Sequence, residues 1–130
     1  MSLMQFCDGE IAEAEAFSVP LTSHALHYGT GVFEGIRSYA TDDGGAAVFR
    51  LPEHLERMRK GAEALGMKFD VAQATEAVLA TLRANGHRDA YIRPLLWFNA
   101  GGLGLDVDKL SERLMVATLP WTSHLGTHRV

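Results

Sequence analysis

The spacing of apolar residues predicts two helices in the middle of the chain. The first begins at Pro52, where a missing N–H costs no hydrogen bond, and ends at Gly66. Its apolar stripe recurs every three or four residues, at Leu55, Met58, Ala62 and Leu65. The second begins at Asp70, with Gln73 forming a near capping box, and ends at Asn85 and Gly86. Its stripe is Ala74, Val78 and Leu82, with Leu79 at the margin.

Strand patterns lie on both sides of these helices. Six segments have strand character: residues 4–7, 10–12, 32–39, 46–51, 90–98 and 113–119. Asp8 and Gly9 form a favoured two-residue turn between the first two segments, which predicts a hairpin. Pro94 interrupts the fifth segment and requires a sheet edge or a bulge, because proline cannot donate to the ladder. Strands segregated from helices predict an α+β fold, with a mostly antiparallel sheet and two helices packed on it.

Composition excludes several classes of function. The formal net charge of −4 over 130 residues provides no basic field for nucleic acid or for an anionic membrane. No apolar run approaches the roughly 20 residues of a membrane span, and no signal peptide is visible. Cys7 is the only cysteine, which excludes an internal disulfide and a cysteine-rich zinc site. We therefore expect a cytoplasmic protein that binds neither nucleic acid nor membrane.

Residues 23–37 combine flexible backbone with binding side chains, reading Ser-His-Ala-Leu-His-Tyr-Gly-Thr-Gly-Val-Phe-Glu-Gly-Ile-Arg. Its glycines allow positive φ or the close approach of a ligand, and Gly35 interrupts a strand-like run. Tyr28, Phe33 and Arg37 add two aromatic faces and a planar cation. These features are typical of a pocket for a small, anionic, partly apolar ligand, although an ordinary glycine-rich loop feeding a strand also fits.

Two further arginines could bind anions. Arg57 projects beside the apolar stripe of the first helix and could fork onto a phosphate, although a solvated pair with Glu53 one turn away fits its spacing better. Arg93 lies in an apolar strand, where a charge is costly unless it is paired or faces a cavity. The alternative is an edge-strand arginine that faces water, with Tyr91 on the same side.

The histidines offer a metal site as one hypothesis. His24 and His27 have a spacing that suits only a helix or turn, and His54 is the third candidate. No carboxylate stands at a telling distance from them, so a structural or interface pair of histidines explains them better. We expect no metal.

Residues 23–37 resemble the signature near the N-terminus of the branched-chain amino acid aminotransferases. These are fold-type IV (class IV) enzymes that use pyridoxal 5′-phosphate. The Glu-His-x-x-Arg pattern that ends at Arg57 is similar to the family segment whose arginine holds the cofactor phosphate, which implies that role here. The Tyr-Ile-Arg-Pro-Leu segment is similar to the family's substrate strand. The resemblance implies that Arg93 recognises a substrate carboxylate, chiefly the second carboxylate of glutamate, and that Tyr91 assists it or lines the pocket.

The resemblance extends to other substrate-binding positions and to a partner subunit. It implies a pocket set of Tyr28, Phe33, Gly35, Leu103, Leu105 and Trp121. In the family the tyrosine and the glycine-rich loop reach the site of a neighbouring subunit, which implies a homodimer. His124 stands where the family has a tyrosine, and this departure leaves the substrate preference open. Arg37 then loses its place as a ligand clamp and becomes structural, paired with Glu34 or holding the pocket loops.

The lysines decide what this chain can catalyse. Lys60, Lys68 and Lys109 do not match the family's Schiff-base segment, which lies in a second domain together with the glutamate for the pyridine nitrogen. The resemblance therefore implies a small α+β domain over residues 1–119, the start of a linker over residues 120–130, and an absent C-terminal domain. We expect no catalytic residue in this chain, and neither cofactor binding nor turnover by the chain alone.

The function implied is transfer of the amino group from leucine, isoleucine or valine to 2-oxoglutarate. A D-amino acid aminotransferase and an aminodeoxychorismate lyase share the fold, but usually diverge from the Phe-Glu-Gly-Ile-Arg and Tyr-Ile-Arg-Pro-Leu segments. A non-catalytic dimeric binding or assembly module is the alternative from another class.

Overall fold

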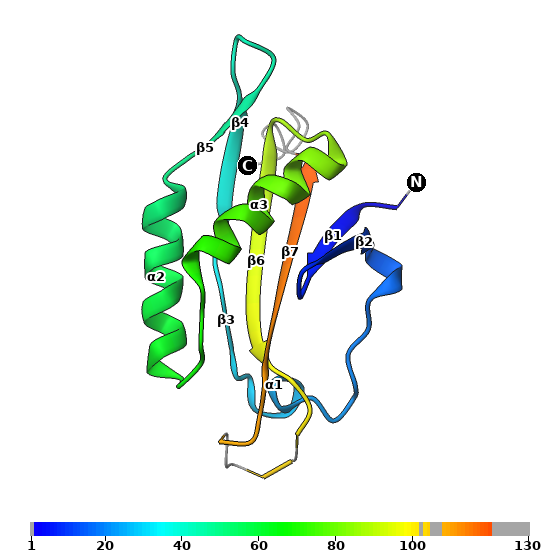
Figure 1. The fold of residues 1–130 in the computed structure, drawn as a ribbon, viewed down its shortest axis with the longest axis vertical. Helices are drawn as coiled ribbons and strands as arrows, with labels where there is room; N and C mark the ends of the chain where they lie inside the picture. The colour runs from blue at the N-terminus through cyan, green and yellow to red at the C-terminus, as the bar shows by residue number, and fades with distance from the viewer. Residues whose placement is uncertain (1, 102, 105–107, 121–130) are drawn as a thin grey trace, which may run out of the picture.

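The computed structural model describes residues 2–101, 103–104 and 108–120, and shows one antiparallel sheet with helices around it (Figure 1). The strands are β1 (Met4–Cys7), β2 (Glu10–Glu13), β3 (Gly31–Phe33), β4 (Ile36–Ala40), β5 (Ala46–Val48), β6 (Ala90–Phe98) and β7 (Glu112–Pro120). The helices are α1 (His24–Tyr28), α2 (Leu51–Ala64) and α3 (Val71–Asn85), with a 3₁₀ turn η1 (Ala14–Ala16). The strand order is β2-β1-β7-β6-β4-β5, and β3 also pairs with β6.

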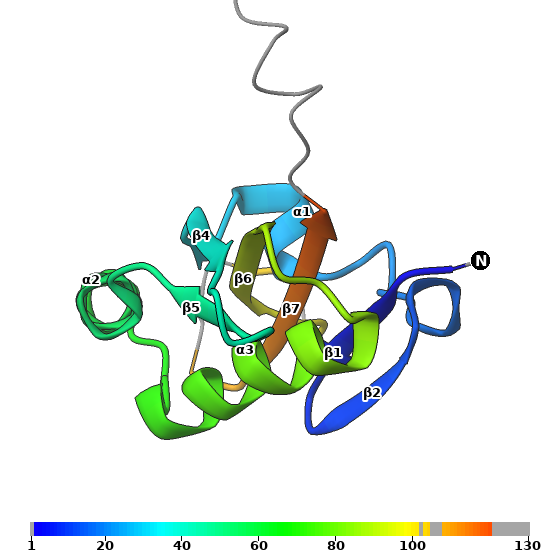
Figure 2. The same ribbon diagram turned by 90° about the horizontal axis from the view of Figure 1, so that it is seen from above.

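The predicted α+β fold is confirmed. In Figure 2, α3 lies across one side of the sheet below β6 and β7, α1 lies on the opposite side, and α2 lies beside the β4 and β5 end. The two long helices begin and end near the predicted residues. Asp70 accepts a hydrogen bond from the backbone N–H of Gln73 at 3.2 Å, and Gly66 and Gly86 follow α2 and α3 with positive φ. The short elements α1 and η1 were not expected. None of the helices in the described part of the chain is both long and apolar enough to cross a membrane.

The third and fourth predicted strands differ from the structure in their bounds. The expected strand over residues 32–39 is split into β3 and β4, and β5 ends at Val48 rather than at residue 51. The chain turns sharply at Arg50, which has a left-handed backbone (φ 57°), so that α2 begins at the next residue. This tight turn sets the start of α2, and therefore which of its residues face β3.

Pro94 lies in the middle of the sheet, so the expectation of a sheet edge or a bulge is wrong. β6 pairs with β7 on one side, and with β3 and β4 on the other. β3 and β4 keep a single register on β6, in which Phe33 pairs with Leu95 and Ile36 pairs with Ile92. Glu34 therefore lies opposite Pro94, whose carbonyl accepts the Glu34 N–H at 3.3 Å but which has no N–H to return. The missing donor interrupts one long strand without shifting its register.

The sheet has a covered face and an open face. Alternate residues of β6, such as Ile92 and Leu96, join the core that the helices bury. The intervening residues Tyr91, Arg93 and Leu95 point to the other face, where they are only partly buried. The predicted substrate strand therefore directs its polar side chains away from the core.

His87, just beyond α3, makes folding dependent on pH. Its Nδ1 lies 2.9 Å from the hydroxyl of Thr118, and burial lowers the pKa of His87. Because the folded pKa lies below the unfolded value of about 6.5, this stability is complete above pH 6.5 and is lost as the pH falls through the folded pKa. We expect His87→Gln to flatten that part of the slope, measured by urea unfolding between pH 7.5 and 5. His27→Gln, at an exposed histidine, is the control. An unchanged slope in the His87 variant would contradict the assignment.

Candidate active site

Four predicted site residues meet on the open face, at the break between β3 and β4. Arg93 donates from Nε and Nη2 to the hydroxyl of Tyr91, at 3.1 and 2.6 Å. The guanidinium carbon of Arg93 also lies 4.1 Å from the centre of the Phe33 ring. Gly35 makes room for the tyrosine, because a Cβ at this position would lie 2.9 Å from the Tyr91 hydroxyl oxygen. Arg93 is therefore held by a phenol and an aromatic face, and among the described residues no further hydrogen bond ties its guanidinium.

Arg57 reaches the same break from α2. It grips the carboxylate of Glu34 with two parallel hydrogen bonds of 2.8 Å, from Nε to Oε2 and from Nη2 to Oε1. Glu53, the partner suggested by helical spacing, bonds to Arg50 at 3.2 Å instead. The pairing of Arg57 with Glu53 is therefore wrong. Even so, the side chain of Arg57 is 72% exposed, so part of its guanidinium faces outward.

Glu34 connects the sheet to α2. Its side chain is only 6% exposed, and Nδ1 of His54 lies 2.6 Å from Oε1, the oxygen that also accepts from Arg57. Burial by itself would raise the pKa of the Glu34 carboxyl, but the hydrogen bonds and charges of Arg57 and His54 outweigh it and lower that pKa. The carboxylate is therefore ionised. Glu34 is thus bonded to α2 through Arg57 and His54, and its suggested pair with Arg37 stays a prediction.

Sequence reasoning did not single out Glu34 as a site residue. The signal that was available is an acidic residue inside an apolar, strand-like run, next to an interrupting glycine. A charge in such a run needs a partner. The partners lie 20 and 23 residues further along the chain, and only the packing of α2 beside β3 identifies them.

A hollow of about 410 Å³ adjoins Arg57. It is lined by Phe49, Arg50, Glu53, His54 and Arg57. Two guanidinium groups, Arg50 paired with Glu53 and Arg57 paired with Glu34, bring to this hollow hydrogen-bond donors of a kind that suits a phosphate.

A second group of predicted residues lies at α1 and the loop after β6. The Tyr28 hydroxyl donates to the carbonyl oxygen of Leu103, and the His24 ring packs on Tyr28 with centroids 4.5 Å apart. His24 is buried, with its two ring nitrogens 2.9 Å from the Thr30 hydroxyl and 3.0 Å from the Gly104 carbonyl. Leu105 and Trp121 lie outside the described residues.

The metal hypothesis finds no support in the described residues, which contain no group of three or more potential ligands. His24 holds the Tyr28 and Leu103 segments together. His27 bonds to the carbonyl of Leu21 at 2.8 Å, and His54 bonds to Glu34. These contacts fit the structural interpretation of the histidines, which stays a prediction.

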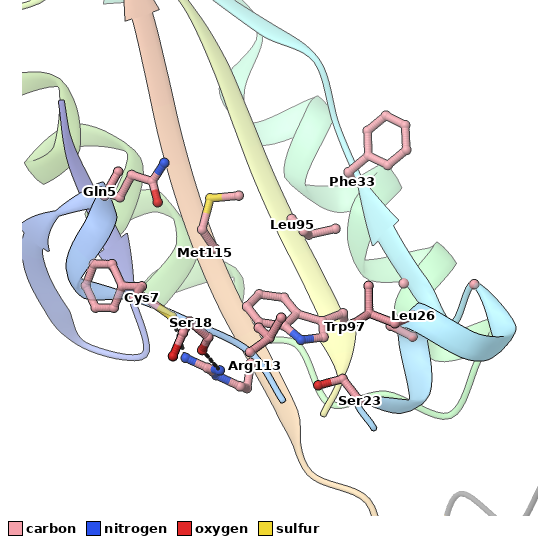
Figure 3. A pocket seen from close by; sticks show the side chains of 16 residues that line it. Gln5, Cys7, Ser18, Ser23, Leu26, Phe33, Leu95, Trp97, Arg113 and Met115 are labelled. Carbon is pink, nitrogen blue, oxygen red and sulfur yellow. Dashed lines mark hydrogen bonds between the residues drawn. The ribbon is translucent and has the colours of Figure 1, made fainter. Parts of the chain in front are cut away.

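The open face also contains a larger hollow, of about 510 Å³ (Figure 3). Its lining is mostly apolar and comes from the segment before α1, from α1 itself and from strands β1, β3, β6 and β7. Trp97 and Arg113 lie side by side in it, with the Arg113 guanidinium carbon 5.2 Å from the centre of the Trp97 ring. Phe33 lies at the rim and links this hollow to the Arg93 group. Six of its lining residues, from Ser23 to Phe33, belong to the segment 23–37 in which the sequence indicated a pocket, whereas no sequence signal indicated the part of the lining that comes from β1 and β7.

Comparison with known proteins relates the chain to one family. The family model described as amino-transferase class IV matches residues 31–130. The branched-chain-amino-acid aminotransferase of Escherichia coli strain K12 is 39% identical over 124 residues, covering 92% of this chain. The enzyme of the same name from Pseudomonas aeruginosa is 35% identical over 121 residues. This chain spans 39% of the length of each of these two relatives.

Solved structures give the same relation. The branched-chain aminotransferase of Thermoproteus uzoniensis with norvaline has a TM-score of 0.86 and 35% identity. The match covers 94% of this chain and 42% of the Thermoproteus uzoniensis chain. The branched-chain amino acid aminotransferase of Thermobaculum terrenum, in its PLP-form (holo-form), has a TM-score of 0.80 and 28% identity. The match covers 96% of this chain and 42% of the Thermobaculum terrenum chain.

Proposed function

The chain belongs to the class IV aminotransferase family, and from that premise we propose that it forms the N-terminal part of a branched-chain amino acid aminotransferase. The reaction would move an amino group between a branched-chain L-amino acid and 2-oxoglutarate. One observation carries this proposal. Two arginines converge on the break between β3 and β4, Arg57 held by Glu34 from one side and Arg93 held by Tyr91 from the other.

Arg93 would bind the second carboxylate of the dicarboxylic substrate. Its guanidinium is fixed by two bonds to Tyr91 and by the Phe33 ring, so little side-chain freedom is lost when an anion binds. The same two aromatic rings would offer an apolar wall to a branched side chain. One site can then accept both substrate classes, because a carboxylate finds the cation and an aliphatic chain finds the rings.

The residues beside α2 fit the phosphate of pyridoxal 5′-phosphate. Arg57 keeps an outward edge, and Arg50 and the hollow of about 410 Å³ lie next to it. When bound, the cofactor would carry the amino group and act as the electron sink of the reaction. Arg57 would anchor it at the phosphate, and Arg93 would orient the substrate.

The lysine that this cofactor requires is not found at either hollow. Lys60, Lys68 and Lys109 are all exposed, and none of them lines either of these two hollows. We propose that the full-length protein supplies this lysine from a second segment, which corresponds to the part of the relatives that lies outside the match with this chain. Residues 1–119 would then form the small domain and residues 120–130 the start of a linker, although Pro120 still pairs within β7.

A second copy of the chain would complete the site. Several apolar side chains are exposed around α1 and the β3 end, namely Leu21, Leu26, Tyr28, Phe33 and Leu103. An apolar patch of this kind favours association. Because Tyr28 and Leu103 are tied to each other, they would be presented to the partner as one unit.

The activity is tested by incubating the full-length protein with pyridoxal 5′-phosphate, leucine and 2-oxoglutarate, and measuring the glutamate formed. Glutamate in proportion to enzyme is the expected result. Absence of transfer from leucine, isoleucine and valine alike would refute the proposal. The described chain by itself is expected to give none.

Arg93→Lys is expected to separate the two substrate classes. A lysine lacks the planar fork with which an arginine can bond Tyr91 and a carboxylate at the same time. The KM for 2-oxoglutarate should therefore rise about tenfold, which corresponds to a loss of roughly 1.4 kcal/mol of binding free energy. The KM for leucine in the forward half-reaction should change less. Arg59→Lys, on the exposed side of α2, is the matched control. An equal rise for both substrates would argue against the assigned role.

A further inference from the structure

The backbone of Glu34 is held by the sheet, although its side chain bonds to α2. Its backbone N–H donates to the Pro94 carbonyl at 3.3 Å, at the point where β3 and β4 share one register on β6. The side chain is 6% exposed, so it cannot swing into water without loss of its bonds. The carboxylate is thus a rigid reference point beside α2.

The two hydrogen bonds from Arg57 fix the plane of its guanidinium. One oxygen of Glu34 accepts from Nε and the other from Nη2, both at 2.8 Å. A bidentate pair of this geometry restricts rotation of the group far more than a single contact does. No described residue bonds Nη1, and the exposed part of the side chain lines the hollow of about 410 Å³. The Nε and Nη2 edge of the Arg57 guanidinium is therefore held by Glu34, while the edge with Nη1 remains available to a ligand in the hollow.

His54 braces the same carboxylate. Since an ionised carboxylate only accepts hydrogen bonds, Nδ1 of His54 carries the proton in its 2.6 Å contact with Oε1. His54 and Arg57 are three residues apart on α2, so their side chains share one side of the helix. The histidine keeps the carboxylate from turning with the arginine.

We propose that Glu34, braced by His54, is a positioning residue that orients Arg57 toward the phosphate of the cofactor. This inference rests on the proposed function. It also opposes a simple electrostatic expectation. Glu34 cancels the charge of Arg57, so its removal would strengthen attraction for an anion if charge alone mattered. The proposal requires that the loss of orientation outweighs this gain.

Glu34→Gln in the full-length protein tests the sign of the effect. Affinity is measured for pyridoxal 5′-phosphate and for pyridoxal, which lacks the phosphate, by absorbance titration. We expect Glu34→Gln to bind pyridoxal 5′-phosphate about tenfold more weakly and to bind pyridoxal with unchanged affinity. About tenfold is the lower end of the loss seen when a residue that orients a metal ligand is removed. Glu56→Gln, which breaks an exposed pair with Arg59 on the same helix, is the control. Tighter binding of the phosphate form, or an equal loss for both ligands, would overturn the proposal.

A double-mutant cycle separates this inference from the proposed function. Arg57→Gln should weaken pyridoxal 5′-phosphate by more than Glu34→Gln does, and Glu34→Gln should have no further effect in that background. If Arg57→Gln leaves the affinity unchanged, the phosphate role itself fails. If it weakens binding while Glu34→Gln does not, only the positioning role fails.

His54→Ala keeps the test decisive where Glu34→Gln does not fold. It leaves the pair of Glu34 and Arg57 in place, and should cost about threefold in affinity for the phosphate form, as for the loss of one ordinary hydrogen bond. Thermal melting confirms that the variant is folded. An unaltered ratio of the affinities for pyridoxal 5′-phosphate and pyridoxal would overturn the part assigned to His54.

Discussion

Gly35→Val is expected to lower kcat/KM for the amino acid substrates of the proposed reaction by at least about 100-fold. A displacement of about 1 Å in the groups that position a substrate can cause a loss of this size. A Cβ at residue 35 would lie 2.9 Å from the Tyr91 hydroxyl oxygen and 3.3 Å from its Cε1. The ring cannot stay where it is, and its hydroxyl is the acceptor for two donors of Arg93. The valine therefore displaces the tyrosine and releases the arginine from its position.

The effect is steric rather than a matter of backbone strain. Gly35 does not have positive φ, unlike Gly29 just before β3, so it is not in the left-handed backbone conformation that favours glycine. Gly35→Ala should already show most of the loss, because the first carbon makes the clash. Gly61→Ala is the matched control. There a new Cβ meets only the side chain of Val32, its Cγ1 at 3.3 Å and its Cβ at 3.8 Å, and alanine favours the helix by up to about 1 kcal/mol.

Steady-state kinetics of the full-length variants, with their thermal melts, measure the outcome. We expect Gly61→Ala to retain kcat/KM within about threefold, while both variants of Gly35 lose it without unfolding. Activity in Gly35→Val similar to that of Gly61→Ala would show that Tyr91 and Arg93 do not form one unit.

The long helices could be predicted because their signals are local. Pro52, Asp70 and Gly86 mark their ends within one turn, and the apolar stripes lie within a single segment. The five residues of α1 are too few for a periodicity to be read, so only the structure reveals that helix. Its buried histidine depends on residues as distant as Gly104.

The rule for Pro94 failed because it considers one strand at a time. A proline in a central strand loses a ladder bond, and the expected remedy is an edge or a bulge. Here the neighbouring strand is itself interrupted at Glu34 and Gly35, which is the point where Pro94 has no N–H to donate. Two separate irregularities, some 60 residues apart in the chain, are one feature of the sheet.

Pairing of charges was the least predictable part of the site. Helical spacing favoured Glu53 as the partner of Arg57, but an exposed pair on a helix gains only about 0.3–0.5 kcal/mol. A buried carboxylate with no partner costs far more, so Glu34 takes the arginine. The family resemblance supplied the residues of the proposed substrate pocket, and the packing of α2 beside β3 shows how Arg57 is held.

Leu55→Ala is expected to lower the free energy of unfolding by about 3 kcal/mol, within the range for a buried leucine replaced by alanine. Leu55 is 0% exposed and belongs to the core cluster that joins α2 to the sheet and to α3. Removal of its side chain leaves a cavity between rigid elements, because β4 and β6 are fixed by their ladder and cannot close around it.

The same helix carries His54 and Arg57 to Glu34, so loosened packing of α2 should also weaken the proposed phosphate site. Urea unfolding followed by circular dichroism measures the stability. Leu65→Ala, at the residue that caps the C-terminus of α2 and is 38% exposed, is the matched control and should cost less than about 1 kcal/mol. Equal losses from the two variants would mean that α2 is not anchored through Leu55, and that Arg57 is held by its bond to Glu34 alone.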